Sequence, residues 1–390
     1  MKLDLQSLLA MPRQSNTAMS KTNSTEGLFF LIRQFFKPEF EMVEVGSLEG
    51  VSTLMFAKFC KKVYSVDYYD YVPPATGRIP QHDAMFATAE KLFIERTKDI
   101  PNIVKIRKSS MEAVKDFENE SLDAVYIDAA HEEEFVREDI REWRKKIKPG
   151  GLLCGHDFWL PYIEKILREE GLNDITTSTD TSWCVPIPTI DLVSVACTKV
   201  PETIEAMRKC QAQKKFTRSI LFTHEDIKAE GIDVIKIDKL DYKGYNEFVA
   251  MELWKYIGSD YILLVQNDGY ITNGAMWTDE FLKYDYIGAP WPVPNDETTY
   301  RTPSGKLIRV GNGGFSLRSR RLLRAPTLLE LKFSDNGTGF PHEDGFLCVH
   351  NREVLEKAGI RFAPVDLAAK FSTEIIVPES VESFGKHKYI

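Results

Sequence analysis

Apolar and polar positions follow two alternating spacings along the first half of the chain, that of buried strands and that of amphipathic helices. Short apolar runs predict strands over 42–45, 62–66, 103–107, 124–127 and 152–154. Helical spacing predicts helices over 27–34, 52–59, 84–97 and 133–146. Strands and helices in turn are typical of an α/β fold with a doubly wound parallel sheet.

This pattern is interrupted over 176–188, where threonine, serine, aspartate and two prolines cluster, so we expect a domain boundary there. The α/β order then resumes, with strands over 191–196, 219–222, 234–237 and 261–265 and helices after Pro201 and over 246–257. No internal repeat is visible. The sequence therefore predicts two different domains, 25–185 and 189–390, after a flexible lead-in over 1–24.

Composition narrows the class of protein. A chain of 390 residues with 43% hydrophobic content can give each domain a core of its own. The net charge of −8 does not supply the positive field that a nucleic acid backbone demands, so nucleic acid is disfavoured as a partner. There is no secretory h-region, no run of about 20 apolar residues, and no Cys-x-x-Cys pair. We expect a cytoplasmic protein with no membrane span and no structural zinc.

A glycine-bearing turn follows the strand at 42–45. In VEVGSLEGVST, Val43 to Thr53, Gly46 permits a tight turn and Gly50 a close backbone approach, and the next helix offers free N–H groups. Asp67 follows about 20 residues later at the end of the next strand, a spacing that suits ribose hydroxyls. A turn that merely needs glycine and a solvated strand-end aspartate are the alternative interpretation.

Two further segments, SLDAVYIDAAH (121–131) and KPGGLLCGHDF (148–158), complete the order of motifs. Together these segments resemble the class I S-adenosylmethionine-dependent methyltransferases, in particular the small-molecule and sugar O-methyltransferase branch. The resemblance implies a Rossmann-like domain that binds S-adenosylmethionine. It also implies roles for matching residues: Glu44, Gly46 and Ser52 on the methionine side, Asp67 on the ribose, Ser110 and Met111 near the adenine, and Asp128 beside the sulfonium.

Methyl transfer to oxygen requires a base or a metal near the sulfonium, because the acceptor hydroxyl must lose its proton. Asp128, His131, His156 and Asp157 are the candidates. In related O-methyltransferases the positions matching Asp128 and Asp157 hold a divalent cation (Mg²⁺ or Mn²⁺), and the position matching His156 is often acidic. Either His156 joins a metal site with these aspartates, or His131 or His156 is the general base. Helix capping by His131 and packing by His156 are the alternative.

The second half carries polar clusters at the ends of apolar segments. Gln266 to Gly269 follow the strongly apolar strand at 261–265, where a carboxylate is placed to hold a divalent cation. The run Gly311 to Gly314 lets the backbone pass close to a ligand, and Trp291 and Phe315 are expected to offer faces to a sugar. A plain tight turn after the strand uses the same residues.

These strings, with GFPHEDGFLC at 339–348, resemble the GT-A glycosyltransferases. The resemblance places Asp268 at an Asp-x-Asp metal motif, although Gln266 replaces the first aspartate. It implies that His387 completes the metal or diphosphate site and that Asp344, beside Glu343, is the general base. Alternatives stay open for each of these residues. His387 is otherwise solvated, and residues 343–344 otherwise form an acidic helix start. We expect either phosphate contacts or plain exposure for Arg318, Arg320 and Arg321.

Together the two halves predict a bifunctional enzyme that methylates a sugar hydroxyl and transfers a sugar from a nucleotide-sugar donor to a glycan or glycosylated acceptor. Fusion would raise the local concentration of a shared intermediate. The main alternative is a methyltransferase with a non-catalytic, glycan-binding C-terminal domain. Methylation of an unrelated small molecule and an assembly scaffold with vestigial pockets are the other two.

Overall fold

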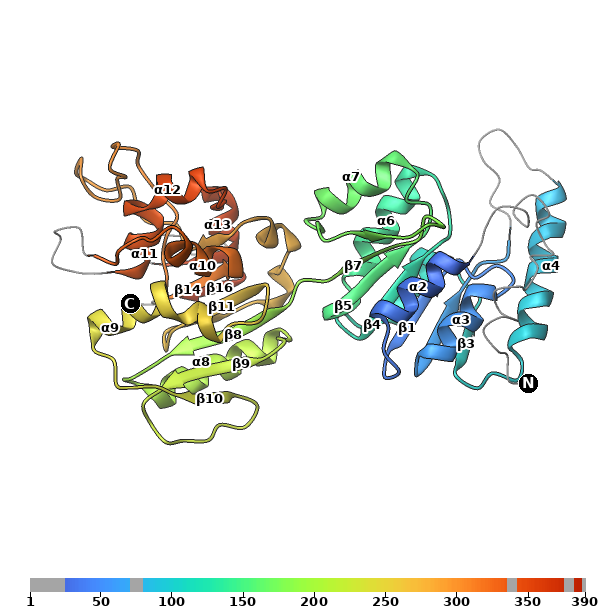
Figure 1. Cartoon of the computed structure of the whole chain (residues 1–390), viewed down its shortest axis with the longest axis horizontal. Helices are drawn as coiled ribbons and strands as arrows, with labels where there is room; N and C mark the ends of the chain where they lie inside the picture. The colour runs from blue at the N-terminus through green and yellow to red at the C-terminus, as the bar shows by residue number, and fades with distance from the viewer. Residues whose placement is uncertain (1–24, 71–79, 335–341, 375–381, 388–390) are drawn as a thin grey trace. The chain divides into compact units, whose positions relative to one another are not determined.

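The computed structural model describes residues 25–70, 80–334, 342–374 and 382–387, and the expected lead-in over 1–24 lies outside them. The chain divides into an N-terminal unit, residues 1–187, and a C-terminal unit, residues 188–390 (Figure 1). Each unit has its own sheet and its own hydrophobic core. Each therefore positions its functional side chains with elements of its own.

The described residues of the N-terminal unit form a seven-stranded sheet in the order β3-β2-β1-β4-β5-β7-β6. Strands β1 to β5 are parallel, and β7 and β6 add antiparallel at one edge. The strands are β1 (Glu41–Val45), β2 (Lys62–Val66), β3 (Ile103–Ile106), β4 (Leu122–Ile127), β5 (Ile147–Gly155), β6 (Thr176–Thr177) and β7 (Trp183–Pro186). The order reverses between β1 and β4, and ligands of doubly wound sheets bind at the carboxyl ends of the strands there.

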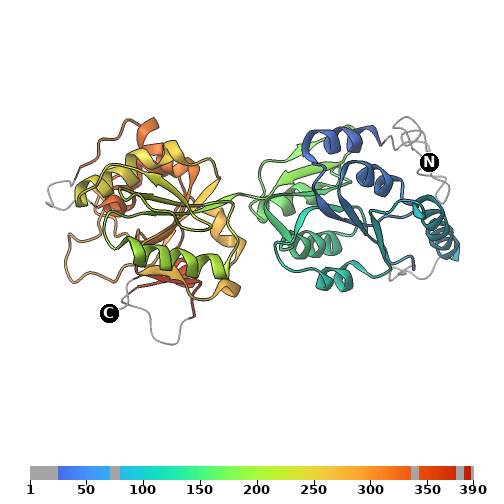
Figure 2. The ribbon, with the colours of Figure 1, turned by 90° about the horizontal axis from the view of Figure 1, so that it is seen from below.

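Helices cover both faces of this sheet (Figure 2). On one face, α2 (Glu26–Phe35) and α3 (Val51–Phe59) pack against β1, β2 and β4. On the other lie α5 (Ser110–Ala113), the 3-10 turn η2 (Val114–Asp116), α6 (Glu133–Arg144) and α7 (Pro161–Glu169). Helix α4 (Pro80–Thr97) forms a smaller cluster with Tyr69. Strands buried on two faces need apolar residues on both, which explains the continuous apolar runs of the sequence.

The segment over 176–188 is not the simple break that its turn-forming residues predict. Strand β7 pairs with β5, in register from Leu152 opposite Pro186 to Gly155 opposite Trp183. Its apolar run, Trp183 to Val185, is buried. A run of three residues between Ser182 and Pro186 is too short to show a strand period, so the turn signals dominate the sequence there.

The C-terminal unit is built on a six-stranded sheet in the order β10-β9-β8-β11-β14-β13. Strand β14 is antiparallel to both of its neighbours, and β8 to β11 are parallel. The strands are β8 (Ile190–Val195), β9 (Ser219–Thr223), β10 (Asp233–Lys236), β11 (Tyr261–Val265), β13 (Tyr286–Gly288) and β14 (Phe315–Ser319). A small second sheet joins β12 (Gly269–Ile271), β16 (Gly385–His387) and β15 (Ser372–Thr373). The order of the large sheet reverses between β8 and β11.

Helices α8 (Val200–Gln213) and α13 (Val365–Phe371) pack on one face of this sheet, and α10 (Arg320–Leu328) packs on the other. A separate apolar cluster joins α10 to the segments that follow the sheet. Those segments are α11 (Glu343–Gly345), the π-helical turn η7 (Phe346–His350) and α12 (Arg352–Lys357), and the short 3-10 turns η5 (Gly274–Met276) and η6 (Asp279–Lys283) connect β12 to β13.

The helix predicted over 246–257 differs from the structure. Helix α9 covers Tyr242–Glu247, and the chain continues as a π-helical turn, η3 (Phe248–Glu252), and a 3-10 turn, η4 (Leu253–Tyr256). Val249 and Leu253 are buried against the sheet. Apolar spacing records only which side chains face the core, so it does not distinguish an α-helix from a widened and then tightened turn.

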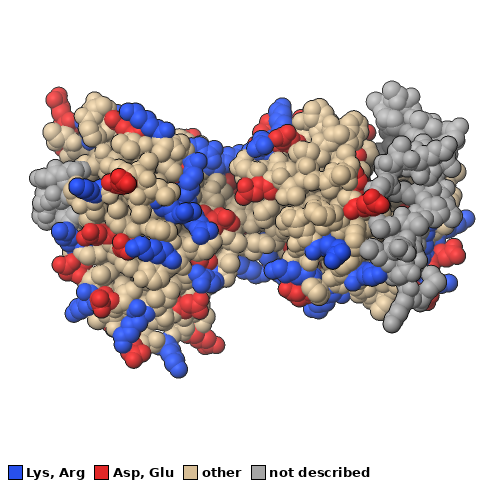
Figure 3. Space-filling model, in the orientation of Figure 1, with Lys and Arg blue, Asp and Glu red and all other residues tan. Residues whose placement is uncertain are grey.

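Charged side chains of both signs are interspersed on the face shown in Figure 3. Many pair on the surface, as Arg137 does with Glu133 at 2.8 Å and Arg168 with Glu164 at 2.7 Å. Exposed pairs of this kind add little stability each. Within the described ranges, none of the helices has both the length and the apolar character needed to cross a bilayer.

Candidate active sites

A cavity of about 580 Å³ opens in the N-terminal unit where β1, β2 and β4 end, at the reversal of strand order. Of the predicted cofactor residues, it brings together Gly46, Ser52, Asp67, Ser110, Met111 and Asp128. His131 also lines it. These residues come from five separate segments of sequence, so the fold collects the dispersed motifs at one place.

The glycine turn after β1 lies directly against the end of β4. Gly46 has φ +88°, and a Cβ built on it would lie 2.0 Å from the carbonyl oxygen of Asp128. Gly50, at φ +79°, precedes α3 and would bring a Cβ within 2.9 Å of the Phe93 ring. Both positions thus require glycine for conformation and for space.

Asp67 holds this turn in place from the end of β2. One carboxylate oxygen accepts hydrogen bonds from the backbone N–H groups of Ser47, at 3.0 Å, and Leu48, at 2.7 Å. The other accepts from the N–H of Tyr69 at 3.0 Å. Each carboxylate oxygen has two lone pairs, so three of the four are used to anchor the turn and one is left to accept a ribose hydroxyl on the side that lines the cavity.

Glu44 is the one predicted cofactor residue outside the cavity lining, although Ser52 and Thr53 are hydrogen-bond partners of its carboxyl group. Its side chain is fully buried within β1, accepts a hydrogen bond from the Thr53 hydroxyl, and does not line the cavity. Burial raises the pKa of this carboxyl to about 7. Ser52, by contrast, lines the cavity from the first turn of α3.

Tyr69 and Asp139 are among the cavity residues that the motif analysis missed. Tyr69 follows Asp67, and its hydroxyl lies 3.2 Å from that of Ser47. Asp139 lies in the middle of α6 and is only 4% exposed. The helical period gives a signal for Asp139, because it shares a face with the buried Val136, Ile140 and Trp143. An acidic residue on the apolar face of a helix needs a partner or a ligand.

His131, His156 and Asp157 converge with Asp128 at the edge of the sheet. The Nε2 of His131 lies 3.0 Å from Oδ2 of Asp157, and the Nδ1 of His156 lies 3.0 Å from Oδ1 of the same carboxylate. His156 Nδ1 is also 3.9 Å from Asp128. Asp157 has φ +58°, a left-handed conformation that is uncommon outside glycine, although aspartate adopts it more readily than most residues.

The charges of this cluster reinforce one another. Burial alone would raise the pKa of Asp157, but the hydrogen bonds and charges of both histidines hold it well below its usual range. Burial would lower the pKa of His156, yet Asp157 and Asp128 raise it to about 9. The hydrogen bond that His131 donates to Asp157 raises the pKa of His131 as well. The cluster therefore stabilises positive charge, whether on a proton or on a metal ion.

The donor set fits a divalent cation. One ligand atom each from Asp128, His131 and Asp157 lies within 4.8 Å of the others. Carboxylate and imidazole ligands together suit several divalent ions. The sequence predicted a ligand set of Asp128, His156 and Asp157. In the structure His131 takes the place of His156 in this set, and His156 contacts Asp157 from outside it.

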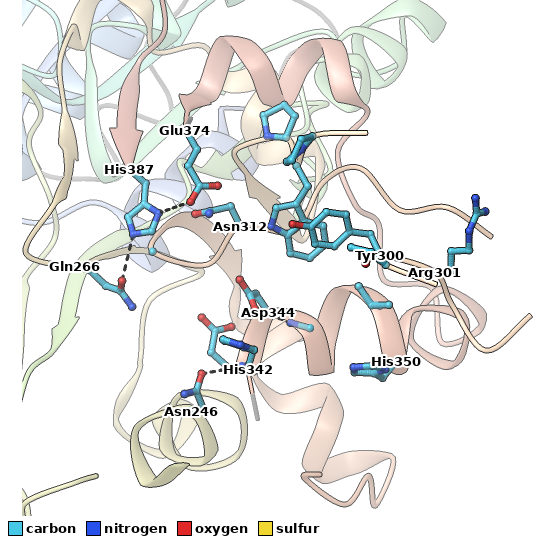
Figure 4. Close-up of a pocket in the computed structure, with 18 of the residues that line it drawn as sticks. Asn246, Gln266, Tyr300, Arg301, Asn312, His342, Asp344, His350, Glu374 and His387 are labelled. Atoms are coloured by element: carbon cyan, nitrogen blue, oxygen red, sulfur yellow. Dashed lines mark hydrogen bonds and ion pairs between the residues drawn. The ribbon is translucent and has the colours of Figure 1, made fainter. Parts of the chain in front are cut away.

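A second cavity, of about 770 Å³, lies in the C-terminal unit at the end of β11 (Figure 4). It is lined from α9, from the Gly311–Gly314 turn, from α11 and from β16, so it draws on residues 242 to 387. Of the predicted residues, Asp344 and His387 line it together with Gln266, while Asp268 does not. Residues that the motif analysis missed here include Tyr245, Asn246, Tyr300, His342, His350 and Glu374.

His387 is buried between acidic and amide side chains. Its Nε2 lies 3.2 Å from the amide oxygen of Gln266, and its Nδ1 lies 3.5 Å from Glu374 (Figure 4). The same Nε2 lies 3.4 Å from Asp268. Asp268, which is 39% exposed, turns one oxygen toward His387. A carboxylate at Nδ1 orients a histidine so that Nε2 can bind a cation. Asp268 and His387 thus offer a pair of possible ligand atoms, 3.4 Å apart.

Asp344 is held by the backbone at the base of this cavity. It accepts hydrogen bonds from the N–H groups of Gly345, at 2.7 Å, and Gly313, at 3.2 Å. Burial and the charge of Glu343 raise its pKa to about 7. Beneath it, Arg318 is 0% exposed and forms an ion pair with Glu343 at 2.9 Å. Arg318 is therefore unavailable for phosphate, because it is the counter-charge of a buried glutamate.

Aromatic residues lie at one wall of the cavity. Trp291 and Tyr300 stack with ring centroids 4.5 Å apart and an interplanar angle of 6°. The far side of Trp291 packs on Gly311, where a Cβ would lie 2.2 Å from the indole. Phe315, expected to face a sugar, is instead fully buried in the core of β14, because alternate positions of that strand face α8 and α13. Tyr300, which stacks on Trp291, lines the cavity as an aromatic residue.

Comparisons with known proteins bear on both units. Residues 43–158 match a family described as a methyltransferase domain, and residues 233–387 match a family described as a protein of unknown function, DUF5672. No curated protein matches the chain. The methyltransferase match spans the glycine turn, Asp67, Asp128, His156 and Asp157, so the matched region is the one that builds the first cavity.

Solved structures that match part of this chain include a putative O-methyltransferase from Klebsiella pneumoniae, 14% identical, which matches over 41% of this chain and 77% of its own, with a TM-score of 0.30. An rRNA methylase from Streptococcus thermophilus is 15% identical over 45% of this chain and 97% of its own, with a TM-score of 0.30. Fibrillarin from Aeropyrum pernix, solved with bound S-adenosyl-L-methionine, is 14% identical over 38% of this chain and 66% of its own, with a TM-score of 0.28.

Proposed function

We propose that this chain, whose N-terminal unit is a class I S-adenosylmethionine-dependent methyltransferase domain, methylates a sugar hydroxyl in that unit and transfers a glycosyl group in its C-terminal unit. The observation that carries the first activity is the meeting of His131, Asp157 and Asp128 at the edge of the first cavity. A proton acceptor and the proposed methyl-donor site thus share one cavity.

When bound, S-adenosylmethionine supplies an electrophilic methyl group on its sulfonium. The acceptor oxygen forms a bond to that carbon as the carbon–sulfur bond breaks, and the hydroxyl proton must leave. We assign this proton to His131, because His131 lines the cavity and its side chain is 47% exposed, whereas His156 is 15% exposed and does not line it. Asp157 at Nε2 orients the ring, which leaves Nδ1 to accept the proton.

Asp128, His131 and Asp157 would hold a divalent cation if the enzyme uses one, and such an ion would acidify a hydroxyl bound to it. Removal of metal distinguishes the two mechanisms. With His131 as base, methyl transfer persists in EDTA. If methyl transfer is lost in EDTA and restored by Mg²⁺ or Mn²⁺, the cluster is instead a cation-binding site.

The test of the first activity uses tritiated S-adenosylmethionine and a panel of p-nitrophenyl glycosides. His131→Gln should lower kcat by about 100-fold or more while the affinity for S-adenosylhomocysteine stays unchanged. His156→Gln is the matched control, since it removes a neighbouring histidine that does not line the cavity. Equal losses for the two variants would reject His131 as the base, and no methylation of any glycoside would reject a sugar acceptor.

Glycosyl transfer in the C-terminal unit rests on the second cavity. Asp344 supplies a backbone-held carboxylate, Asp268 and His387 supply candidate cation ligands, and Tyr300 supplies an aromatic face. A carboxylate beside the acceptor can take the proton of the attacking hydroxyl, which is the role of the base in inversion. The alternative is a non-catalytic glycan-binding module, for which the aromatic wall would be enough.

Calorimetric titration with UDP, GDP, CDP and dTDP, each with Mn²⁺, tests this second activity. Binding of one nucleotide is expected, and Asp344→Asn should keep that binding while it removes hydrolysis and transfer of the matching nucleotide sugar. Binding of oligosaccharides without any nucleotide would favour the glycan-binding module. Absence of both kinds of binding would leave methylation of an unrelated small molecule or a scaffold.

A further inference from the structure

Asp139 is a buried titratable group of the first cavity to which the proposed methyl transfer gives no role. It comes from the middle of α6, lines the cavity beside Ser110 and Met111, and is 4% exposed. Burial raises the pKa of its carboxyl to about 6. A carboxylate held in such a place without an opposite charge is costly unless it has hydrogen-bond donors.

A chain of hydrogen bonds fixes the direction of this carboxylate. The buried indole N–H of Trp143 donates to the hydroxyl oxygen of Ser110 at 2.8 Å. The Ser110 hydroxyl then donates its own proton to Oδ1 of Asp139. Because the indole can only donate, every proton in this chain points toward Asp139. Oδ1 thus accepts its hydrogen bond from Ser110, and the carboxylate still offers a hydrogen-bond acceptor to the cavity.

Phe135 provides an independent observation on the same helix. It lies one turn before Asp139, at i and i+4, so the ring and the carboxylate share one face of α6. Phe135 lines the cavity and is 48% exposed, which is unusual for a phenylalanine within a folded unit. An aromatic face beside a fixed acceptor matches a flat heterocycle that stacks on the ring and points an amino group at the carboxylate.

We propose that Asp139 accepts a hydrogen bond from the exocyclic amino group of the adenine of S-adenosylmethionine, with Phe135 against the ring, and so makes the site specific for adenine. This inference rests on the assignment of the cavity to that cofactor. The inference adds a contact between the adenine and a side chain of α6 to the expected contacts with Ser110 and Met111, which follow β3. A purine without the amino group leaves the buried carboxylate unpaired, which is how hydrogen-bonding sites reject analogues.

The experiment compares three ligands by calorimetry on the full chain: S-adenosylhomocysteine, its 6-deamino analogue with hydrogen in place of the amino group, and S-inosylhomocysteine. The wild type should bind S-adenosylhomocysteine about tenfold or more tightly than the deamino analogue. Asp139→Asn keeps the shape, but Ser110 holds the amide oxygen and the NH₂ faces the cavity. That variant should lose the preference for adenine and bind S-inosylhomocysteine better than the wild type does.

Glu134→Gln is the matched control, because Glu134 is an exposed acidic residue of the same helix that does not line the cavity. It should leave the ratio of the two affinities unchanged. A wild type that binds the deamino analogue as tightly as S-adenosylhomocysteine overturns the proposal, even if the Asn variant does not fold. Equal weakening of all three ligands in Asp139→Asn overturns it too, since that result indicates a structural role. No binding of S-adenosylhomocysteine by the wild type would remove the cofactor assignment itself.

Discussion

At the scale of single residues, Gly46 is a position in the first cavity where a side chain has no room. Alanine there would combine a left-handed conformation with a Cβ 2.0 Å from the Asp128 backbone, which cannot rotate away. Gly46→Ala should destabilise the N-terminal unit by about 2 kcal/mol or more and abolish binding of S-adenosylhomocysteine. Calorimetry gives both values.

Gly305→Ala is the control for Gly46. Its φ of +89° is nearly the same, but no atom lies within 4 Å of the added Cβ. It should cost about 1 kcal/mol of conformational strain alone. Equal effects of the two substitutions would show that contact with Asp128 is unimportant.

Glu44 makes the stability of the N-terminal unit depend on pH. The folded state raises the pKa of this buried carboxyl from 4.5 to about 7, so the folded state binds the proton more tightly than the unfolded chain. Stability from this group is present at low pH and is lost as pH rises from 4.5 to 7, by about 3 kcal/mol at most. Glu44→Gln should flatten this decline in the calorimetric transition that S-adenosylhomocysteine shifts. If the stability of Glu44→Gln falls with pH as steeply as that of the wild type, Glu44 is not the cause of the decline.

Single residues also mark the limits of sequence analysis. Gly46, Asp67 and Asp128 could be predicted because their spacing follows the strand ends, and the structure gathers them in one cavity. Phe315 was expected to face a sugar, and Arg318 was expected either to contact phosphate or to be exposed, but both are fully buried. Their true partners, the core of β14 and Glu343, are distant in sequence, and a local pattern contains no information about them.

At the scale of elements, the pair of Arg318 and Glu343 joins β14 to α11 under the second cavity. Arg318→Met leaves Glu343 buried without a counter-charge and should destabilise the C-terminal unit by about 3–5 kcal/mol. Adding Glu343→Gln should restore most of the loss. The measurement is the calorimetric transition that S-adenosylhomocysteine does not shift, and failure of the double variant to recover would mean that packing, not charge, dominates.

Element prediction succeeded where strands are buried on both faces and helices show a regular period, as for β1, β4 and α6. It failed where tertiary contacts decide. Strand β7 forms because Trp183 and Cys184 pack against β5, and α9 passes into a π-helical turn so that Val249 and Leu253 both reach the sheet. Neither contact leaves a periodic trace in sequence.

At the scale of the whole molecule, the two units have separate cores and separate cavities. We expect residues 1–187, expressed alone, to fold and to bind S-adenosylhomocysteine with the affinity of the full chain. Residues 188–390, expressed alone, should unfold in the calorimetric transition that S-adenosylhomocysteine does not shift in the full chain. A fragment that unfolds, or loses more than about tenfold in affinity, would show that each unit needs the other.

The second cavity is assembled from residues as far apart as Tyr242 and His387, because β16 pairs with β12. On the ribosome, the N-terminal unit has emerged in full before any of these residues is made, so it can fold and load its cofactor first. The second cavity stays open until the codon for His387 has been read. A premature stop late in the message would therefore yield a protein with its methyl-donor site intact and its other site missing a wall.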